Sequence, residues 1–315
     1  MRFIDAGTVH RSLSVGRAAY VLREALLDGV EPDADAPRSR AAAPGGQLLL
    51  MPSASRDHAG CKVLTAAPGN PDRGLPAIQG GYLLFAGGTL TPLALIEGAA
   101  LTELRTPAVS FAGVLEVVQA RREPGRPLRV AILGTGPQGV HHALGAAELF
   151  DPVEIVFVAR TPREVACPVP HRVAERIPEG ADLILCATSA ATPVLDSAEV
   201  ADAAVVVAVG AHHPERRELP GELMARASVI VEAAGPAREE CGDIALAIAE
   251  GHLADGAWST MAEVVRDRGL ALRLAARDRP VVFKTAGQGW EDLAVAVEVL
   301  ARAGADPAGE PGRGR

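Results

Sequence analysis

Residues 128–139 read LRVAILGTGPQG, a short apolar run with strand character that leads directly into a glycine-rich turn. The spacing Gly134-x-Gly136-x-x-Gly139 matches a dinucleotide-binding fingerprint. The first glycine allows the tight turn, the second lets the backbone approach a pyrophosphate, and the third lets a helix pack against the strand. A helix that begins near Pro137 would direct unpaired N–H groups and its positive dipole end at the phosphates. This stretch therefore predicts a dinucleotide site in the middle of the chain.

On the C-terminal side of the motif, apolar runs of strand length alternate with helical or loop segments, which is typical of a doubly wound parallel sheet. One connection departs from this pattern. The segment between Arg160 and Asp182 is short and rich in proline, so we expect the cofactor domain to be shortened there. The expected strands are Leu128–Leu133, Val153–Val158, Asp182–Ala187, Ala204–Val209, Ser228–Glu232 and Val281–Phe283.

The N-terminal side has a different pattern. Apolar residues at helical spacing predict a helix over Ser12–Asp28, and residues 31–46, rich in proline, alanine and aspartate, read as extended or looped. Four strand-like runs follow, with a hairpin turn at residues 86–89, so we expect a mainly antiparallel sheet with helices on one side. These runs are Gln47–Met51, Cys61–Ala66, Gly81–Phe85 and Leu90–Ile96.

A helical pattern over Ala99–Ala120 contains a proline, Pro107. Because proline is best tolerated in the first turn of a helix, we expect a break near Arg105 and a new helix capped by Thr106. The polar segment 123–127 then marks a domain boundary. The expected division is a first domain of residues 1–123 with the helix 291–303, a second domain of residues 124–290, and a disordered tail at 304–315.

The composition argues against several function classes. Apolar residues make up 48% of the chain and the formal net charge is −8, so a basic face for nucleic acid is not expected. No apolar run has the length of a membrane span and residues 1–5 lack a signal-peptide pattern, so we expect a cytoplasmic protein that does not bind a membrane. The four cysteines do not have metal-ligand spacing, and we expect no metal site.

Several stretches in order along nearly the whole chain resemble the ornithine cyclodeaminase/mu-crystallin family. They are Pro37-Arg38, Leu48–Pro52, Gly60–Val63, Pro68–Asn70, Gly74–Pro76, Leu101-Thr102, Arg105-Thr106, Val209–Ala211, Glu218-Leu219, Phe283–Gly287 and Glu291–Ala294. The resemblance implies a homodimer, in which an α+β substrate-binding and dimerisation domain closes over a Rossmann domain. It also implies that the Rossmann domain binds NAD(H) or NADP(H).

The resemblance assigns Arg38, Lys62 and Arg105 to the carboxylate of an amino- or imino-acid substrate. Two planar guanidinium groups and one ammonium can saturate the lone pairs of a carboxylate. The alternative is that all three are surface charges, although Lys62 stands inside a strand-like run. Met51 and Ala286 are expected to shape the substrate pocket.

The resemblance also implies dinucleotide contacts beyond the three glycines. Thr106, as the cap of a helix, would direct that helix N-terminus toward a phosphate, and a plain capping role is equally compatible. The residues assigned in this way are Thr106, Pro137, Gln138, Thr188, Val209, Gly210, Ala211 and Thr285.

The residues after the second strand of the cofactor domain bear on the choice between NAD and NADP. NAD-specific sites place a carboxylate there to bind the ribose hydroxyls. In this chain the strand is followed by Arg160, Thr161 and Arg163, without a carboxylate among them. An arginine suits a 2′-phosphate, so we expect NADP(H) to be preferred, with NAD(H) possible. Alternatively, Arg160 only stacks on the adenine and selectivity is weak.

His212 departs from the family pattern. Ornithine cyclodeaminases carry an aspartate at this position, which suits the side-chain ammonium of ornithine, whereas a protonated histidine would repel it. Relatives without the aspartate are typically ketimine reductases or amino-acid dehydrogenases. His212 could supply the proton that such a reduction needs, because histidine titrates near neutral pH, and Lys62 or an ordered water is an equal candidate. A purely structural role for His212 is also open.

The sequence thus favours an NADPH-dependent reductase of small cyclic ketimine acids of the Δ1-pyrroline-2-carboxylate or Δ1-piperideine-2-carboxylate type. The product would be L-proline or L-pipecolate. Two alternatives stay open: an ornithine or related amino-acid cyclodeaminase, and a protein that binds NADPH without catalysis, as mu-crystallin-like proteins can.

Overall fold

The computed structural model describes residues 1–305, which form two compact units. Unit 1 contains Met1–Val21, Asp35–Arg105 and residues 288–305, and unit 2 contains Leu22–Ala34 and Thr106–Gly287. The division therefore falls inside one helix, α3 (Gly98–Arg121), whereas the sequence-based boundary lay after that helix. Of the tail expected to be disordered, residues 306–315 lie outside the described residues, and the first two belong to a helix.

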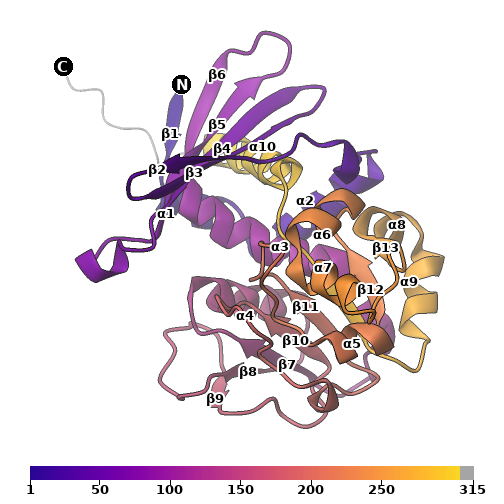
Figure 1. Ribbon diagram of the computed structural model, residues 1–315. Helices are drawn as coiled ribbons and strands as arrows, with labels where there is room; N and C mark the ends of the chain where they lie inside the picture. Colours follow the sequence, from indigo (N-terminus) through magenta and orange to yellow (C-terminus); the bar gives the residue numbers. More distant parts are fainter. Residues whose placement is uncertain (306–315) are drawn as a thin grey trace. The chain divides into compact units, whose positions relative to one another are not determined.

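Unit 2 is built on an eight-stranded parallel sheet in the order β13-β12-β14-β11-β10-β7-β8-β9 (Figure 1). All six strands expected from apolar runs are present, and the doubly wound α/β class is confirmed. The two edge strands, β9 and β13, were not predicted. The strands are β7 (Leu128–Leu133), β8 (Val153–Val158), β9 (Arg172–Ala174), β10 (Leu183–Cys186), β11 (Val205–Ala208), β12 (Ser228–Val231), β13 (Ser259–Thr260) and β14 (Val281–Lys284).

The shortened connection expected between Arg160 and Asp182 is confirmed. Between β8 and β10 the structure contains the three-residue strand β9 and no helix. Elsewhere in unit 2, helices connect the strands. They are α4 (Pro137–Leu149), α5 (Gly221–Arg226), α6 (Ala234–Glu240), α7 (Gly242–Ala249), α8 (Met261–Arg266) and α9 (Arg268–Ala275).

Unit 1 contains a six-stranded sheet in the order β1-β6-β5-β4-β3-β2. All neighbours are antiparallel except β1 and β6, so the mainly antiparallel sheet is confirmed. The helix α10 (Gly289–Ala305) packs on β3, β4 and β5. The strands β1 and β2 and the helix α1 were not predicted. The remaining elements are β1 (Arg2–Ile4), β2 (Ser39–Ala43), β3 (Gly46–Ala54), β4 (His58–Ala66), β5 (Ile78–Ala86), β6 (Pro92–Glu97), α1 (Ala6–Ser12) and α2 (Val15–Leu27), which crosses into unit 2.

The predicted helix break near Arg105 is wrong. The helix α3 continues through Pro107, and Thr106 lies inside it rather than capping it. The carboxylate of Glu97 instead accepts hydrogen bonds from the first-turn N–H groups, at 2.7 Å for Ala100. A proline inside a helix costs about 3 kcal/mol. That cost is outweighed because the helix buries large side chains such as Phe111, each contributing about 1.5–3 kcal/mol.

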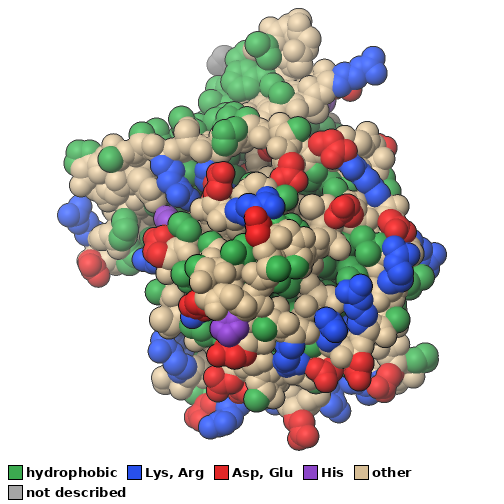
Figure 2. All heavy atoms as spheres, turned by 45° about the vertical axis from the view of Figure 1, so that its right-hand side comes forward, with side chains coloured by type: hydrophobic (Ala, Val, Ile, Leu, Met, Phe, Trp, Pro, Cys, Tyr) green, Lys and Arg blue, Asp and Glu red, His purple; other side chains and the backbone are tan. Residues whose placement is uncertain are grey.

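None of the helices within residues 1–305 is both long and apolar enough to cross a bilayer. On the face drawn in Figure 2, basic and acidic side chains are interspersed, and neither sign gathers into one large patch.

Candidate functional site

The glycine motif forms the turn between β7 and α4. Gly134 has a positive φ of 123°, and a Cβ there would lie 2.3 Å from the carbonyl oxygen of Ala187. A Cβ on Gly139 would lie 2.0 Å from the carbonyl oxygen of Gly134. Packing therefore requires both glycines. Within residues 1–305 a Cβ on Gly136 would meet no atom within 4 Å, so packing does not explain this glycine, and the close backbone approach to a pyrophosphate expected from the motif stays a prediction.

The motif lies at the point where the strand order reverses. In the sheet, β7 stands between β8 on one side and β10 on the other. Open α/β sheets bind ligands outside the carboxyl ends of the strands at this switch point. Gly136 is the N-cap of α4, Pro137 and Gln138 begin its first turn, and no side chain of the described residues caps the helix. The N-terminal end of a helix suits an anion, because its backbone N–H groups and its dipole point toward that end.

The loops after β10 and β11 are joined by one buried carboxylate, that of Glu218. It accepts hydrogen bonds from the backbone N and the Oγ1 of Thr188, at 2.8 and 2.7 Å, and from the backbone N of Gly210 at 2.6 Å. Burial raises the pKa of Glu218. Glu218 thus brings together two predicted cofactor residues, Thr188 and Gly210. Val209 and Ala211, which are also predicted to contact the cofactor, flank Gly210 on the loop after β11.

A buried ion pair between Asp243 and Lys284 lies next to Glu218. Asp243 Oδ1 accepts the backbone N–H of Glu218 at 2.8 Å, and Asp243 Oδ2 lies 3.3 Å from the Nζ of Lys284. Burial opposes the charge on Lys284, but Asp243 and nearby acidic groups outweigh it and raise the pKa of the lysine. Sequence reasoning missed Asp243, although it is the one carboxylate in the otherwise apolar helix α7.

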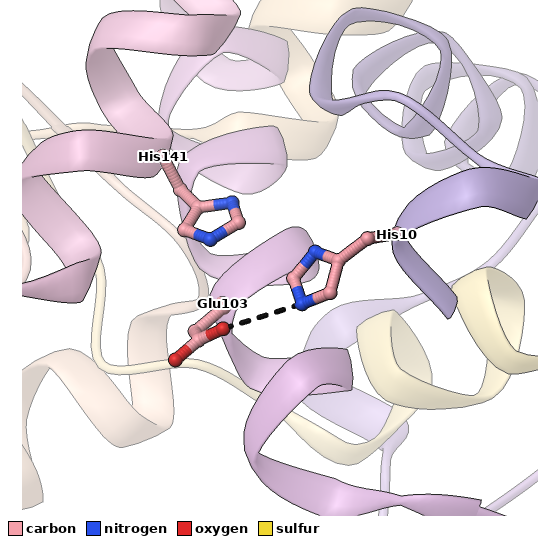
Figure 3. A group of neighbouring side chains, drawn as sticks. All are labelled: His10, Glu103 and His141. Carbon is pink, nitrogen blue, oxygen red and sulfur yellow. Dashed lines mark ion pairs between the residues drawn. The ribbon is translucent and has the colours of Figure 1, made fainter. Parts of the chain in front are cut away.

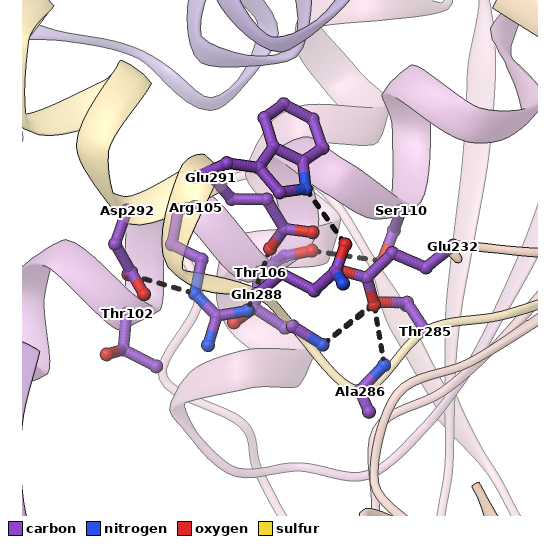
Figure 4. Close-up of polar contacts among 12 residues, drawn as sticks. Thr102, Arg105, Thr106, Ser110, Glu232, Thr285, Ala286, Gln288, Glu291 and Asp292 are labelled. Carbon is purple, nitrogen blue, oxygen red and sulfur yellow. Dashed lines mark hydrogen bonds and ion pairs between the residues drawn. The ribbon is translucent and has the colours of Figure 1, made fainter. Parts of the chain in front are cut away.

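A second buried carboxylate, Glu232, holds the loop after β14. It accepts hydrogen bonds from the Oγ1 of Thr285 at 2.7 Å and from the backbone N of Ala286 and Gly287, both at 2.9 Å. Figure 4 shows Glu232 directed at Thr285 and Ala286. The structure therefore places Ala286, predicted to contact substrate, in unit 2 beside a predicted cofactor residue. Glu232 was read only as the last residue of a strand.

The other predicted residues of unit 2 lie on exposed loops. Arg160, Thr161 and Arg163 follow the carboxyl end of β8 and are exposed. His212 is exposed on the loop after β11, with its Nδ1 3.1 Å from the carbonyl oxygen of Gly210. Because that oxygen can only accept, Nδ1 carries a hydrogen and Nε2 is the atom that can exchange a proton.

In unit 1, one row of cross-strand partners carries the predicted substrate residues. Met51 pairs with Lys62, and Lys62 pairs with Tyr82. Paired residues point to the same face of a sheet, and all three are at most 3% exposed. Arg38 immediately precedes β2 and is half-buried, and the next residue, Ser39, pairs with Leu50, the neighbour of Met51 on β3.

Lys62 and Arg105 meet the carboxylates of Glu291 and Asp292 at the start of α10, and we call these four residues the Lys62 cluster. The Nζ of Lys62 lies 2.8 Å from Asp292 Oδ2, and Lys62 is 1% exposed. Arg105 lies 3.3 Å from both Glu291 and Asp292, and Figure 4 shows it directed at them. Burial, then the charge of Arg105, lower the pKa of Lys62 to about 8.

A second ion pair of unit 1 lies outside the Lys62 cluster. The Nε2 of His10 is 3.4 Å from Glu103 Oε2, as drawn in Figure 3. The pair joins α1 to α3 and carries charge only when His10 is protonated. His141, also drawn there, belongs to α4 of unit 2.

Two curated relatives of this chain are named as imine reductases. The chain is 29% identical over 261 residues to Delta(1)-pyrroline-2-carboxylate reductase 2 of Burkholderia ambifaria, covering 79% of this chain and 78% of the relative. It is 32% identical over 261 residues to the ketimine reductase mu-crystallin of Rattus norvegicus, covering 80% and 79% of the two chains.

Two solved structures have the same fold. A probable ornithine cyclodeaminase from Bordetella pertussis superposes with a TM-score of 0.82 at 29% identity, covering 99% of each chain. A Thermococcus litoralis Delta(1)-pyrroline-2-carboxylate reductase, solved with NADH and L-proline, superposes with a TM-score of 0.83 at 23% identity, covering 96% and 97%. The family model described as "Ornithine cyclodeaminase/mu-crystallin family" matches residues 24–306, so the chain belongs to the ornithine cyclodeaminase/mu-crystallin family.

Proposed function

We propose that the chain is an NADPH-dependent reductase of small cyclic ketimine acids such as Δ1-pyrroline-2-carboxylate, with L-proline or L-pipecolate as product. The observation that carries the proposal is the joining of Lys62 and Arg105 in one buried cluster of unit 1. The imine reductases among the relatives support the same reaction class.

The residues of unit 2 suit a nicotinamide dinucleotide. The open backbone at Gly136 and the uncapped first turn of α4 would receive the pyrophosphate, and the loops held by Glu218 and Glu232 would line the nicotinamide. When bound, the reduced cofactor supplies a hydride to the carbon of the C=N bond. The role of the chain is to orient both reactants and to deliver one proton to the nitrogen.

In this proposal Arg38, Lys62 and Arg105 hold the substrate carboxylate. The Lys62 cluster pairs two cations with two carboxylates, and Arg38, just before β2, is the third cation assigned to the substrate. The proton comes from the Nε2 of His212, whose Nδ1 is engaged by Gly210, or from the ammonium of Lys62.

A panel of cyclic and linear ketimine acids, assayed with NADPH and NADH side by side, tests the proposal directly. We expect oxidation of NADPH with the five- and six-membered cyclic substrates, and slower turnover with NADH. No oxidation with any ketimine removes the reductase proposal.

The structural likeness to the probable ornithine cyclodeaminase favours a second candidate function, cyclodeamination. Release of ammonia from L-ornithine, without net change in the cofactor, would select it. Tight NADPH binding without turnover in either assay would instead indicate a protein that binds NADPH without catalysis.

The pKa of Lys62 gives the first kinetic prediction. Its ammonium is protonated below pH about 8 and neutral above, so kcat/KM for the ketimine should fall as the pH rises through about 8. The Lys62→Arg variant keeps its charge throughout that range, and we expect it to be slower but to lack this fall. Identical pH profiles for the two proteins would show that Lys62 does not control the reaction.

Arg160 gives a prediction on cofactor choice. We propose that its guanidinium binds the 2′-phosphate of NADP(H), because it follows the end of β8 next to the glycine turn. The Arg160→Ser variant should raise KM for NADPH at least about tenfold and leave KM for NADH unchanged, as expected for loss of one charge-assisted contact. Arg163→Ser measures the contribution of the second guanidinium. Equal losses with both cofactors would instead favour stacking on the adenine.

We also propose that the chain forms a homodimer through the open face of the unit 1 sheet. Residues that alternate with the buried row are apolar and only half-buried. An apolar face of this kind is typical of a subunit interface. The apolar, half-buried residues of this face are Cys61, Val63, Leu83, Phe85, Leu93 and Leu95.

Light scattering should give twice the monomer mass, and Leu83→Arg should give the monomer mass. The matched control is Leu272→Arg, which places the same charge at an exposed leucine of unit 2. A Leu83→Arg protein that stays dimeric and folded would place the interface elsewhere.

A further inference from the structure

Tyr82 carries a buried hydroxyl that the proposed chemistry has not used. The residue is 0% exposed, and within residues 1–305 its hydroxyl oxygen has no hydrogen-bond partner. A buried hydroxyl without a partner is unfavourable because it has given up its bonds to water. Such a group is expected to meet its partner in a bound molecule.

Gly60 leaves the space that the side chain of Tyr82 occupies. A Cβ on Gly60 would lie 2.1 Å from the hydroxyl oxygen of Tyr82 and 2.5 Å from its Cζ. Gly60 lies two residues before Lys62 on β4, so both are on the same face of the sheet. The side chain of Tyr82 therefore extends from the position opposite Lys62 into the space that a side chain at residue 60 would occupy.

The surroundings of the hydroxyl keep it a hydrogen-bond donor. Burial, and then the charge of Asp292, raise the pKa of the phenol well above its usual value. The two carboxylates that affect it already have partners. Asp292 binds Lys62, and Asp35 accepts the backbone N–H of Trp290 at 2.8 Å.

We propose that the Tyr82 hydroxyl donates a hydrogen bond to the carboxylate of the ligand bound at the Lys62 cluster. The inference rests on the proposed function in that the ligand is a small carboxylic acid. Tyr82 then adds a neutral donor to the cations of Lys62 and Arg105. Its bond to a carboxylate oxygen is charge-assisted, which makes it stronger than a bond between two neutral groups.

The Tyr82→Phe variant tests this because it removes only the hydroxyl. The probe is pyrrole-2-carboxylate, a planar ring acid without a reducible C=N bond, titrated calorimetrically into each protein. We expect its Kd to rise about tenfold, which corresponds to about 1.4 kcal/mol. With a ketimine substrate, KM should rise by the same factor while kcat stays within about twofold. The melting temperature should not fall, because the hydroxyl has no partner within the described chain.

Tyr20→Phe is the matched control, since Tyr20 is the other tyrosine of the chain and is 43% exposed. It should leave Kd and KM unchanged. An unchanged Kd in Tyr82→Phe overturns the proposal, and a lower melting temperature with unchanged Kd would assign the hydroxyl to a buried water.

The binding measurement also separates this inference from the proposed function. If the probe binds the wild type and binds Tyr82→Phe more weakly, but no ketimine is reduced, then the reductase proposal fails and the role of Tyr82 stands. If ketimines are reduced equally by both proteins, the reductase proposal stands and the role of Tyr82 fails. A wild-type protein that does not bind the probe overturns the proposed role of Tyr82.

Discussion

The contact between the ammonium of Lys62 and the carboxylate of Asp292 is the interaction on which unit 1 depends. Removing one partner of a buried ion pair leaves an uncompensated charge and typically costs about 3–5 kcal/mol. Because Lys62 lies on β4 and Asp292 on α10, the pair requires the C-terminal helix to pack on the sheet. Arg105 of α3 joins the same carboxylate, so the contacts that hold the helix in place also gather the cations.

Unit 2 uses buried carboxylates for a different purpose. Glu218 and Glu232 accept backbone N–H groups from loops at the carboxyl ends of β10, β11 and β14. Buried N–H groups of irregular loops need such acceptors, because they have no neighbouring strand to bond. Asp243 in turn fixes the backbone of Glu218. The shape of the predicted cofactor edge is therefore set by side chains that need not touch the cofactor themselves.

The sequence predicted the central strands well and the edges poorly. A strand buried on both faces, such as β11, is a continuous apolar run, whereas the two-residue strand β13 consists of Ser259 and Thr260 and gives no such signal. The helix break at Pro107 was wrong because local propensity was outweighed by burial on both sides of it. The resemblance pointed to Lys62 as a site residue, but its partner stands 230 residues away, and charge patterning reveals only local pairs.

The buried carboxylates of Glu218 and Glu232 also determine at which step the loops after β10, β11 and β14 lose conformational entropy. Thr188, Gly210 and Thr285 are tied to Glu218 and Glu232 by bonds within the chain. Their conformational entropy is therefore given up when the chain folds rather than when a molecule arrives. A molecule that binds at this edge would therefore meet little ordering cost, and the contact energy gained there would be retained as affinity.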